Sequence, residues 1–379
     1  MNRKKYVILY SAFLFFSLSA FLHCVQNEEA NLEKTANYRI RADIETEPVS
    51  AKQNDDAADD PAIWINFDDP NKSLIVGTNK KAGLNLYDLN GNEVFFIDEG
   101  RVNNVDVRYG FDLNGTIVDI IGSSNRSNNS LALHILDGEK QELIPVHART
   151  IKSQVDEVYG FCFYHSHISG NYYAFINGKD GQIEQWQLFA TPGNKIDAEL
   201  IRTLRVDSQP EGMVADDEMG ILYTGEEGRG VWRFKAEPDR GDKKTFIQKT
   251  GKENPAMEFD VEGLAILYLP EGKGYLIVSS QGNNSYAVFN RNGRNEYLKS
   301  FNIIEGENID GAEETDGLEV SNYGFSERFP AGILVVQDGF NFDGDSLSSQ
   351  NFKIVDLRKV VKVIDPDMII DPGYNPYKK

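Results

Sequence analysis

The chain alternates short apolar segments with polar turns, and no stretch has the sustained helical period that a helical crossover between parallel strands would need. One pattern recurs: an acidic residue near the start of an apolar strand, then a second aliphatic strand, a turn of Gly, Asn or Ser, and an alternating strand. Alternation bounded by turn residues predicts strands joined as hairpins. The aliphatic strand occurs six times, over residues 74–80, 120–126, 173–179, 222–227, 276–281 and 334–338.

The acidic residues that lead these units are spaced 46 to 54 residues apart. They are Asp60, Asp106, Glu157, Glu211, Glu262 and Asp316. A period of about 50 residues with several strands per unit is typical of propeller blades. We therefore predict an all-β fold, a six-bladed β-propeller with four-stranded antiparallel blades around a central channel. The alternating segment 38–44 is expected to supply a strand that closes the ring onto the last blade.

The N-terminus has the pattern of an export signal. Arg3, Lys4 and Lys5 precede an uncharged stretch over 6–22, which is shorter than the ~20 residues of a membrane span. Cys24 follows, and the segment resembles a bacterial lipoprotein signal. Lipid anchoring at the bacterial cell envelope, simple cleavage with secretion or release to the periplasm, and an uncleaved anchor all remain open. The predicted organisation is a signal peptide at 1–23, a polar tether at 24–40 and a propeller domain at 41–379.

Composition narrows the function. The 379 residues include 39 basic and 59 acidic side chains, a net charge of −20, which argues against a nucleic-acid binder because such a protein needs a basic face. With 40% hydrophobic residues the chain can form a core. Two cysteines cannot make a disulfide framework, and Cys162, flanked by aromatic residues, is expected to be an inert core thiol. We expect a monomer.

Equivalent positions of successive blades lie at one height around the axis, so the repeats predict two rings of side chains. The leading acids form the first ring, with Asp56, Asp59, Asp260 and Asp310 beside it. Crowded carboxylates raise one another's pKa, and hard cations such as Ca²⁺ relieve this, so several calcium ions are expected. In the second ring Lys80, Arg126 and Lys179 oppose Glu227, Gln281 and Asp338, an arrangement suited to an anionic ligand. The alternative is that these residues are turn acceptors and solvated turn lysines.

At these residues the sequence resembles the β-propeller phytases, also called alkaline phytases, over about residues 45–362. The matching stretches are DDPAIW (59–64), NKKAGL (79–84), NNVDVRY (103–109), SNRS (124–127), EVYGF (157–161), GKDG (178–181), EGMVADDE (211–218), DVEGL (260–264), SQGN (280–283) and VQDG (336–339). Two departures are visible, since Asp180 stands where glutamate is expected and Phe340 stands where a polar residue is typical.

The resemblance implies calcium-dependent hydrolysis of phytate, myo-inositol hexakisphosphate, by a 3-phytase type of phosphomonoesterase with separate cleavage and affinity phosphate sites. It implies phosphate contacts by Lys80, Arg126, Tyr159 and Lys179. It implies calcium ligands at Asp60, Glu211, Glu227, Asp260, Glu262 and Asp310, with Gln281 and Asp316 near them and Asp338 and Asn341 at a structural calcium. The charge pattern adds Asp56 to the metal ligands, and His165 is a further candidate for phosphate contact. The expected substrate is phytate or its calcium complex.

The sequence lacks the Arg-His-Gly-x-Arg-x-Pro segment of histidine phosphatases, and Cys162 is not followed by the arginine of a Cys-x5-Arg loop. Covalent catalysis is therefore not expected, and we predict direct attack by a metal-bound water. Lys80, Arg126 and Lys179 would stabilise the phosphoryl oxygens, and Tyr159 and Glu211 complete the predicted catalytic set. Two alternatives stay open: another exported six-bladed hydrolase such as a metal-dependent lactonase, and a non-catalytic binding propeller.

Overall fold

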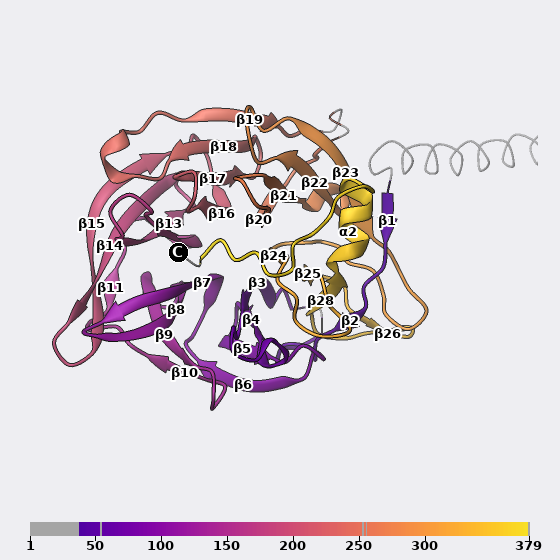
Figure 1. The fold of residues 1–379 in the computed structure, drawn as a ribbon, viewed down its shortest axis with the longest axis horizontal. Coiled ribbons are helices and arrows are strands. Elements are labelled where there is room, and N and C mark those ends of the chain that lie inside the picture. The colour runs from indigo at the N-terminus through magenta and orange to yellow at the C-terminus, as the bar shows by residue number, and fades with distance from the viewer. Residues whose placement is uncertain (1–37, 54, 252–253, 255, 378–379) are drawn as a thin grey trace, which may run out of the picture.

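The computed structural model describes residues 38–377 except 54, 252, 253 and 255. Six antiparallel blades form a ring around a central channel, as Figure 1 shows, so the predicted six-bladed propeller is confirmed. The predicted signal peptide, Cys24 and most of the predicted tether lie outside the described residues. No helix within the described part of the chain is long and apolar enough to span a membrane.

The blades follow one another along the chain, each starting with the strand nearest the channel. Blade one contains β3 (Ala58–Trp64), β4 (Leu74–Asn79), β5 (Gly83–Tyr87) and β6 (Glu93–Asp98). Blade two contains β7 (Val102–Leu113), β8 (Thr116–Asn125), β9 (Ser130–Asp137) and β10 (Glu142–Pro145), and β11 (Ile151–Lys152) also pairs with β9. Blade three contains β12 (Val158–His165), β13 (Tyr172–Gly178), β14 (Gln182–Thr191) and β15 (Lys195–Arg205).

The later blades repeat this order. Blade four contains β16 (Pro210–Asp216), β17 (Ile221–Glu226), β18 (Gly230–Lys235) and β19 (Thr245–Lys249). Blade five contains β20 (Val261–Tyr268), β21 (Gly274–Ser280), β22 (Ser285–Asn290) and β23 (Tyr297–Ile303). Blade six contains β24 (Leu318–Ser321), β25 (Ile333–Asp338) and β28 (Asn351–Asp356). Short 3₁₀ turns occupy Pro70–Lys72, Pro238–Arg240 and Gln281–Asn283, and α2 (Leu357–Ile364) follows β28.

The N-terminal strands close the ring differently from the prediction for 38–44. Only β2 (Ile44–Glu45) pairs with the last blade, antiparallel to β28. The preceding β1 (Tyr38–Ile40) instead adds a parallel fifth strand to blade five, along β23. The alternating pattern thus identified strands correctly, but a three-residue interruption over 41–43 divides it between two blades.

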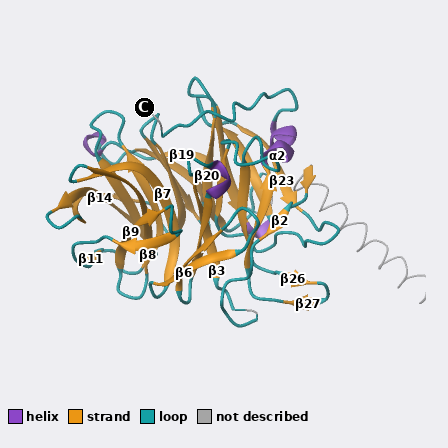
Figure 2. Cartoon of the chain, turned by 60° about the horizontal axis from the view of Figure 1, so that its bottom comes forward, coloured by secondary structure: helices purple, strands orange, loops and turns teal. Residues whose placement is uncertain are grey.

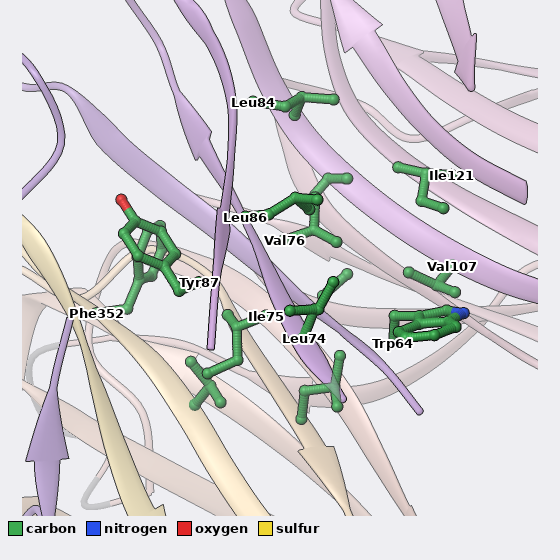
Figure 3. Close-up of a cluster of buried hydrophobic side chains, with 14 of the residues drawn as sticks. Trp64, Leu74, Ile75, Val76, Leu84, Leu86, Tyr87, Val107, Ile121 and Phe352 are labelled. Carbon is green, nitrogen blue, oxygen red and sulfur yellow. The ribbon is translucent and has the colours of Figure 1, made fainter. Parts of the chain in front are cut away.

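Side chains between adjacent blades form the core, because both faces of each blade are covered by its neighbours. Figure 3 shows one such cluster, in which Trp64 and Val76 of blade one pack with Val107 of blade two and Phe352 of blade six. Gly77 is required here, since a Cβ at this position would lie 2.4 Å from the Phe352 ring. Cys162 is a free, buried thiol whose pKa is raised by burial, consistent with the predicted core position.

The two faces of the propeller are finished differently. The hairpin of β26 (Phe342–Asp343) and β27 (Ser346–Leu347) projects from one face, and the C-terminal segment lies on the other (Figure 2). This segment returns across the ring to the channel (Figure 1), where the Tyr377 ring packs 5.1 Å from Tyr109 and 6.1 Å from Tyr268, between centroids. The last described turn therefore covers the channel end remote from β26 and β27.

Candidate active site

A bulge near the start of each innermost strand selects the side chains at the channel entrance. In blades one to five the pairing register shifts after the first strand residue, so two residues face one residue of the partner strand. The pairing of Leu318 with Val336 places the equivalent pair of blade six at 316–317. The first residues of these pairs form the entrance ring: Asp59, Asn103, Tyr159, Glu211, Glu262 and Asp316.

The second bulge position explains why adjacent blades can approach closely in this ring. It is glycine in four blades. A Cβ on Gly160 would lie 1.9 Å from the backbone carbonyl oxygen of Glu211, and a Cβ on Gly212 would lie 2.2 Å from that of Glu262. The Gly317 amide donates to the Asp59 carbonyl at 2.9 Å. From blade three round to blade one, the backbones of adjacent bulges are therefore in close contact.

The predicted acidic ring is wrong at three of its six positions. Asp60 follows the ring residue Asp59, while Asp106 and Glu157 lie elsewhere in their blades. Asp60 accepts a hydrogen bond from the Val105 amide at 3.0 Å and lines the channel interior. Spacing aligned on acids missed Asp59, which it placed only beside the ring, and Asn103. Alignment on the glycine that follows Tyr159, Glu211, Glu262 and Asp316 would have found the register.

Three carboxylates converge on one side of the ring. Glu211, Glu227 and Glu262 each offer an oxygen within 4.8 Å of the other two, a spacing suitable for one cation. Glu262 Oε2 is buried and meets no hydrogen-bond donor in the described part of the chain. Asn103 donates to Glu211 at 2.7 Å and Gln209 donates to Glu227 at 2.5 Å, so neutral amides orient the carboxylates without neutralising them. Asp260 is near enough to raise the pKa of Glu227.

Lys80 is the cation on the opposite side of the ring. Its ammonium lies 2.8 Å from Asp316, 3.0 Å from Asp59 and 2.5 Å from Asp56. Gln281 donates to the second Asp316 oxygen at 2.7 Å. One lysine thus faces three carboxylates, and Asp59 Oδ2 remains without a donor among the described residues.

The pKa values reflect this shortage of positive charge. Burial raises the pKa of Asp59 and Glu262 well above the ordinary range, and nearby Glu211 raises both further. Burial also raises the pKa of Glu227 to about 7, and that of Asp316 to about 6 although Lys80 opposes the shift. Burial lowers the pKa of Lys80, but the neighbouring carboxylates outweigh it and raise the pKa above its usual value. Unpartnered oxygens and raised pKa values are what a hard-cation site presents without its ion, so these residues fit calcium.

A basic arc adjoins the ring at blades two and three. The Tyr159 ring lies 5.3 Å from the Arg126 guanidinium carbon and 4.5 Å from the Lys179 ammonium, distances of cation–π contacts. Arg126 donates to Asn103 of the ring at 3.2 Å. The structure thus brings Lys80, Arg126, Tyr159 and Lys179 to the same face of the propeller as the carboxylates.

Other predicted ligands lie in a separate group around a buried lysine. The Lys353 ammonium lies 3.1 Å from Asp338 and 3.3 Å from Asn341 Oδ1, and it also contacts Asp310. Glu45 completes the group at 2.6 Å. The candidate structural-calcium residues therefore surround an ammonium group here, and Asp310 joins them rather than the carboxylates of the ring.

His165 is the one predicted phosphate contact that lies far from the others. Tyr159 is at the start of β12 and His165 is at its end, about 20 Å away at ~3.3 Å per residue. There the imidazole stacks on Tyr172 with ring centroids 4.0 Å apart, and the backbone amide donates to Asp217. This end of the strand belongs to the opposite face of the propeller.

Comparisons with known proteins bear on the family of the chain. The family model described as Phytase matches residues 5–379. The 3-phytase of Bacillus subtilis (strain 168) is 42% identical over 346 residues, covering 90% of each chain. Among solved structures, a functionally unknown protein from Desulfotomaculum acetoxidans DSM 771 matches with TM-score 0.44 and 17% identity, covering 64% of this chain and 71% of that one. BBS1N in complex with ARL6DN matches with TM-score 0.45 and 11% identity, covering 82% and 80%. These two likenesses are too remote to inform function. The chain belongs to the phytase family.

Proposed function

We propose that the protein removes phosphate from phytate in a calcium-dependent reaction in which water attacks phosphorus directly. Membership of the phytase family supports the substrate and the reaction class. The observation that carries the calcium dependence is the group of Glu211, Glu227 and Glu262, which is short of positive charge and lies beside a basic arc. Bound calcium supplies Lewis-acid chemistry, drawing negative charge from water and phosphate oxygens.

The charge of the protein requires local neutralisation of the substrate. A protein with a net charge of −20 repels a polyanion at long range. Lys80, Arg126 and Lys179 offset this at the entrance ring, and each well-placed donor of this kind contributes roughly 2–4 kcal/mol to the transition state in comparable sites. The Tyr159 ring packs against both Arg126 and Lys179.

Two phosphate positions follow from the arrangement. A phosphate beside the three glutamates and Lys80 would lie at the cation site, and we assign cleavage to this position. A second phosphate near Lys179, on the far side of Tyr159, would be held by lysine and arginine alone, and we assign affinity to this position. Because phytate carries a phosphate on every ring carbon, one molecule can occupy both positions.

Direct attack by water fits the residues that surround the ring. Cys162 is buried in the core with a raised pKa, so it is a poor nucleophile. His165 lies at the other end of β12. Neither residue is positioned to form a covalent phosphoenzyme.

The test is release of inorganic phosphate from phytate, measured with calcium and after chelation. We expect release in calcium, loss of release with chelator and recovery when calcium is added back. A lactone substrate serves as the control for the alternative hydrolase class. Phosphate release that persists undiminished in excess chelator would contradict the calcium dependence, and lactone turnover without phosphate release would contradict the reaction.

A further inference from the structure

The Glu157 carboxylate lies between two cations of the basic arc. Its Oε1 is 2.5 Å from the Arg126 guanidinium and 3.7 Å from the Lys179 ammonium. These pairs, together with Arg101, lower the pKa of Glu157, so the group is an anion at neutral pH. The carboxylate therefore occupies the position between Arg126 and Lys179 where a phosphate oxygen would meet both.

The Arg126 guanidinium has two N–H donors on one edge, and Glu157 accepts a hydrogen bond from only one of them. Its first terminal nitrogen donates to Asn103, and its second donates to Glu157. Nε is buried and meets no acceptor within the described residues. A planar guanidinium binds phosphate best through two parallel donors on one edge. The edge formed by Nε and the second terminal nitrogen would offer both donors once Glu157 moved away.

Glu157 is also free to move. Its side chain is 45% exposed, whereas the Arg126 side chain is only 12% exposed. Ion pairs with an exposed partner are weak, typically about 0.2–1 kcal/mol, and are readily exchanged. The backbone of Glu157 stays fixed, since its carbonyl accepts from the Lys179 amide at 3.2 Å. Only the side chain needs to rotate to clear the site.

We propose that Glu157 is a built-in competitor for phosphate: its carboxylate neutralises Arg126 and Lys179 in the free enzyme and rotates into solvent when a phosphate binds. This inference rests on the proposed function of the basic arc. The competitor weakens every phosphate at this position, including the product. It thereby limits retention of product in a site whose two cations would otherwise hold it tightly.

The experiment compares Glu157→Gln with the wild-type enzyme. Inorganic phosphate is titrated calorimetrically, at a calcium concentration below that which precipitates calcium phosphate, and phytate turnover is measured in parallel. We expect the Kd of phosphate to fall about 3–10-fold, with KM for phytate falling more than kcat. Glu142→Gln on β10 is the matched control, because it removes the same charge from an exposed glutamate of an outer strand and should change the Kd less than twofold.

The opposite result would show that Glu157 holds Arg126 in place. In that case phosphate would bind more weakly to Glu157→Gln than to the wild type. A Kd within twofold of wild type would also contradict the proposal that Glu157 competes with phosphate. Should the Gln variant fail to fold, Glu157→Asp shortens the reach to Arg126 and should tighten phosphate by a smaller factor. The two proposals fail separately: an enzyme that releases no phosphate from phytate refutes the function, whereas the calorimetric comparison still decides the role of Glu157.

Discussion

The two ends of the central channel treat buried carboxylates in opposite ways. At the end covered by Tyr377, Arg108 lies 2.8 Å from Asp106 and 3.0 Å from Asp217, and also donates to the Phe163 carbonyl. The guanidinium there satisfies acids from blades two and four with several hydrogen bonds. At the entrance ring, by contrast, Lys80 alone faces a larger set of acids, and two of these retain oxygens without a donor among the described residues.

The difference separates structural acids from functional ones. The buried carboxylates of Asp106 and Asp217 both accept hydrogen bonds from the Arg108 guanidinium, so they carry their cation within the fold. On our proposal, those of the entrance ring need positive charge supplied from outside the chain. The same rule explains why Asp106, although acidic and periodic, lies outside the candidate site: its partner Arg108 follows two residues later.

The largest expected effect follows from removing Arg108, the cation of the channel end that Tyr377 covers, which we call the closed end. Arg108→Met leaves Asp106 and Asp217 buried and unpaired, and we expect the free energy of unfolding to fall by about 3–5 kcal/mol. Urea unfolding with and without calcium measures it. Lys80→Met at the entrance is the comparison: its loss of stability should shrink in calcium, whereas that of Arg108→Met should not. Equal dependence on calcium in both variants would contradict the distinction between the two ends.

The next effect concerns catalytic activity at the entrance ring. Glu211→Gln removes one of three converging carboxylates, and we expect phosphate release from phytate to fall at least about 100-fold, near 2.7 kcal/mol, with cooperative unfolding retained. Glu218→Gln is the control, because the Glu218 carboxylate accepts hydrogen bonds from Arg291 and Tyr374 on the opposite face of the propeller. Its turnover should stay within twofold of wild type. Near-normal turnover in Glu211→Gln would remove the carboxylate group from the mechanism.

Chelation should affect stability through the same carboxylates. Calcium at 100 times its Kd stabilises the folded state by about 2.7 kcal/mol, so its removal should lower Tm by about 4 °C. Thermal unfolding in calcium and in excess chelator measures the shift. In Glu211→Gln the shift should be smaller, since one ligand is missing. A wild-type melt unchanged by chelator would show that the ring acids need no external cation.

The sequence predicted the architecture better than it predicted the register. Blade number, strand content and the gathering of Lys80, Arg126 and Lys179 follow from repeats that each encode the same hairpins, whereas Tyr159 was identified only through the resemblance to the phytases. The bulge was not predicted, because its extra residue changes which side chain points to the channel without visibly changing the spacing of the repeats along the sequence. That is why Asp59 was placed beside the ring and Asp60 within it. The contacts of Glu157 with Arg126 and Lys179 could not be predicted from the sequence, since these two residues lie 31 and 22 positions away from it on other hairpins.

The last test concerns Glu319, a largely buried acid near the end of the channel covered by Tyr377, for which no salt bridge is found among the described residues. Burial, with a smaller contribution from Asp106, raises the pKa of Glu319 to about 8, although Arg108 opposes the shift. Tyr377 and Tyr109 also face this carboxyl group. The unfolded chain releases this proton near 4.5, so between pH 4.5 and 8 the folded state binds more protons. Stability should therefore fall as pH rises through this window, by up to about 1.4 kcal/mol per unit.

Glu319→Gln cannot ionise, so it should flatten this slope. We expect the variant and the wild type to be similarly stable near pH 5, and the variant to be the more stable near pH 8. Urea unfolding across this range, in chelator so that calcium binding does not contribute, measures both slopes. Parallel slopes would mean that Glu319 ionises in the folded state as readily as in the unfolded chain. The closed end would then tolerate an unpaired charge, and the contrast with the entrance ring would rest on Arg108 alone.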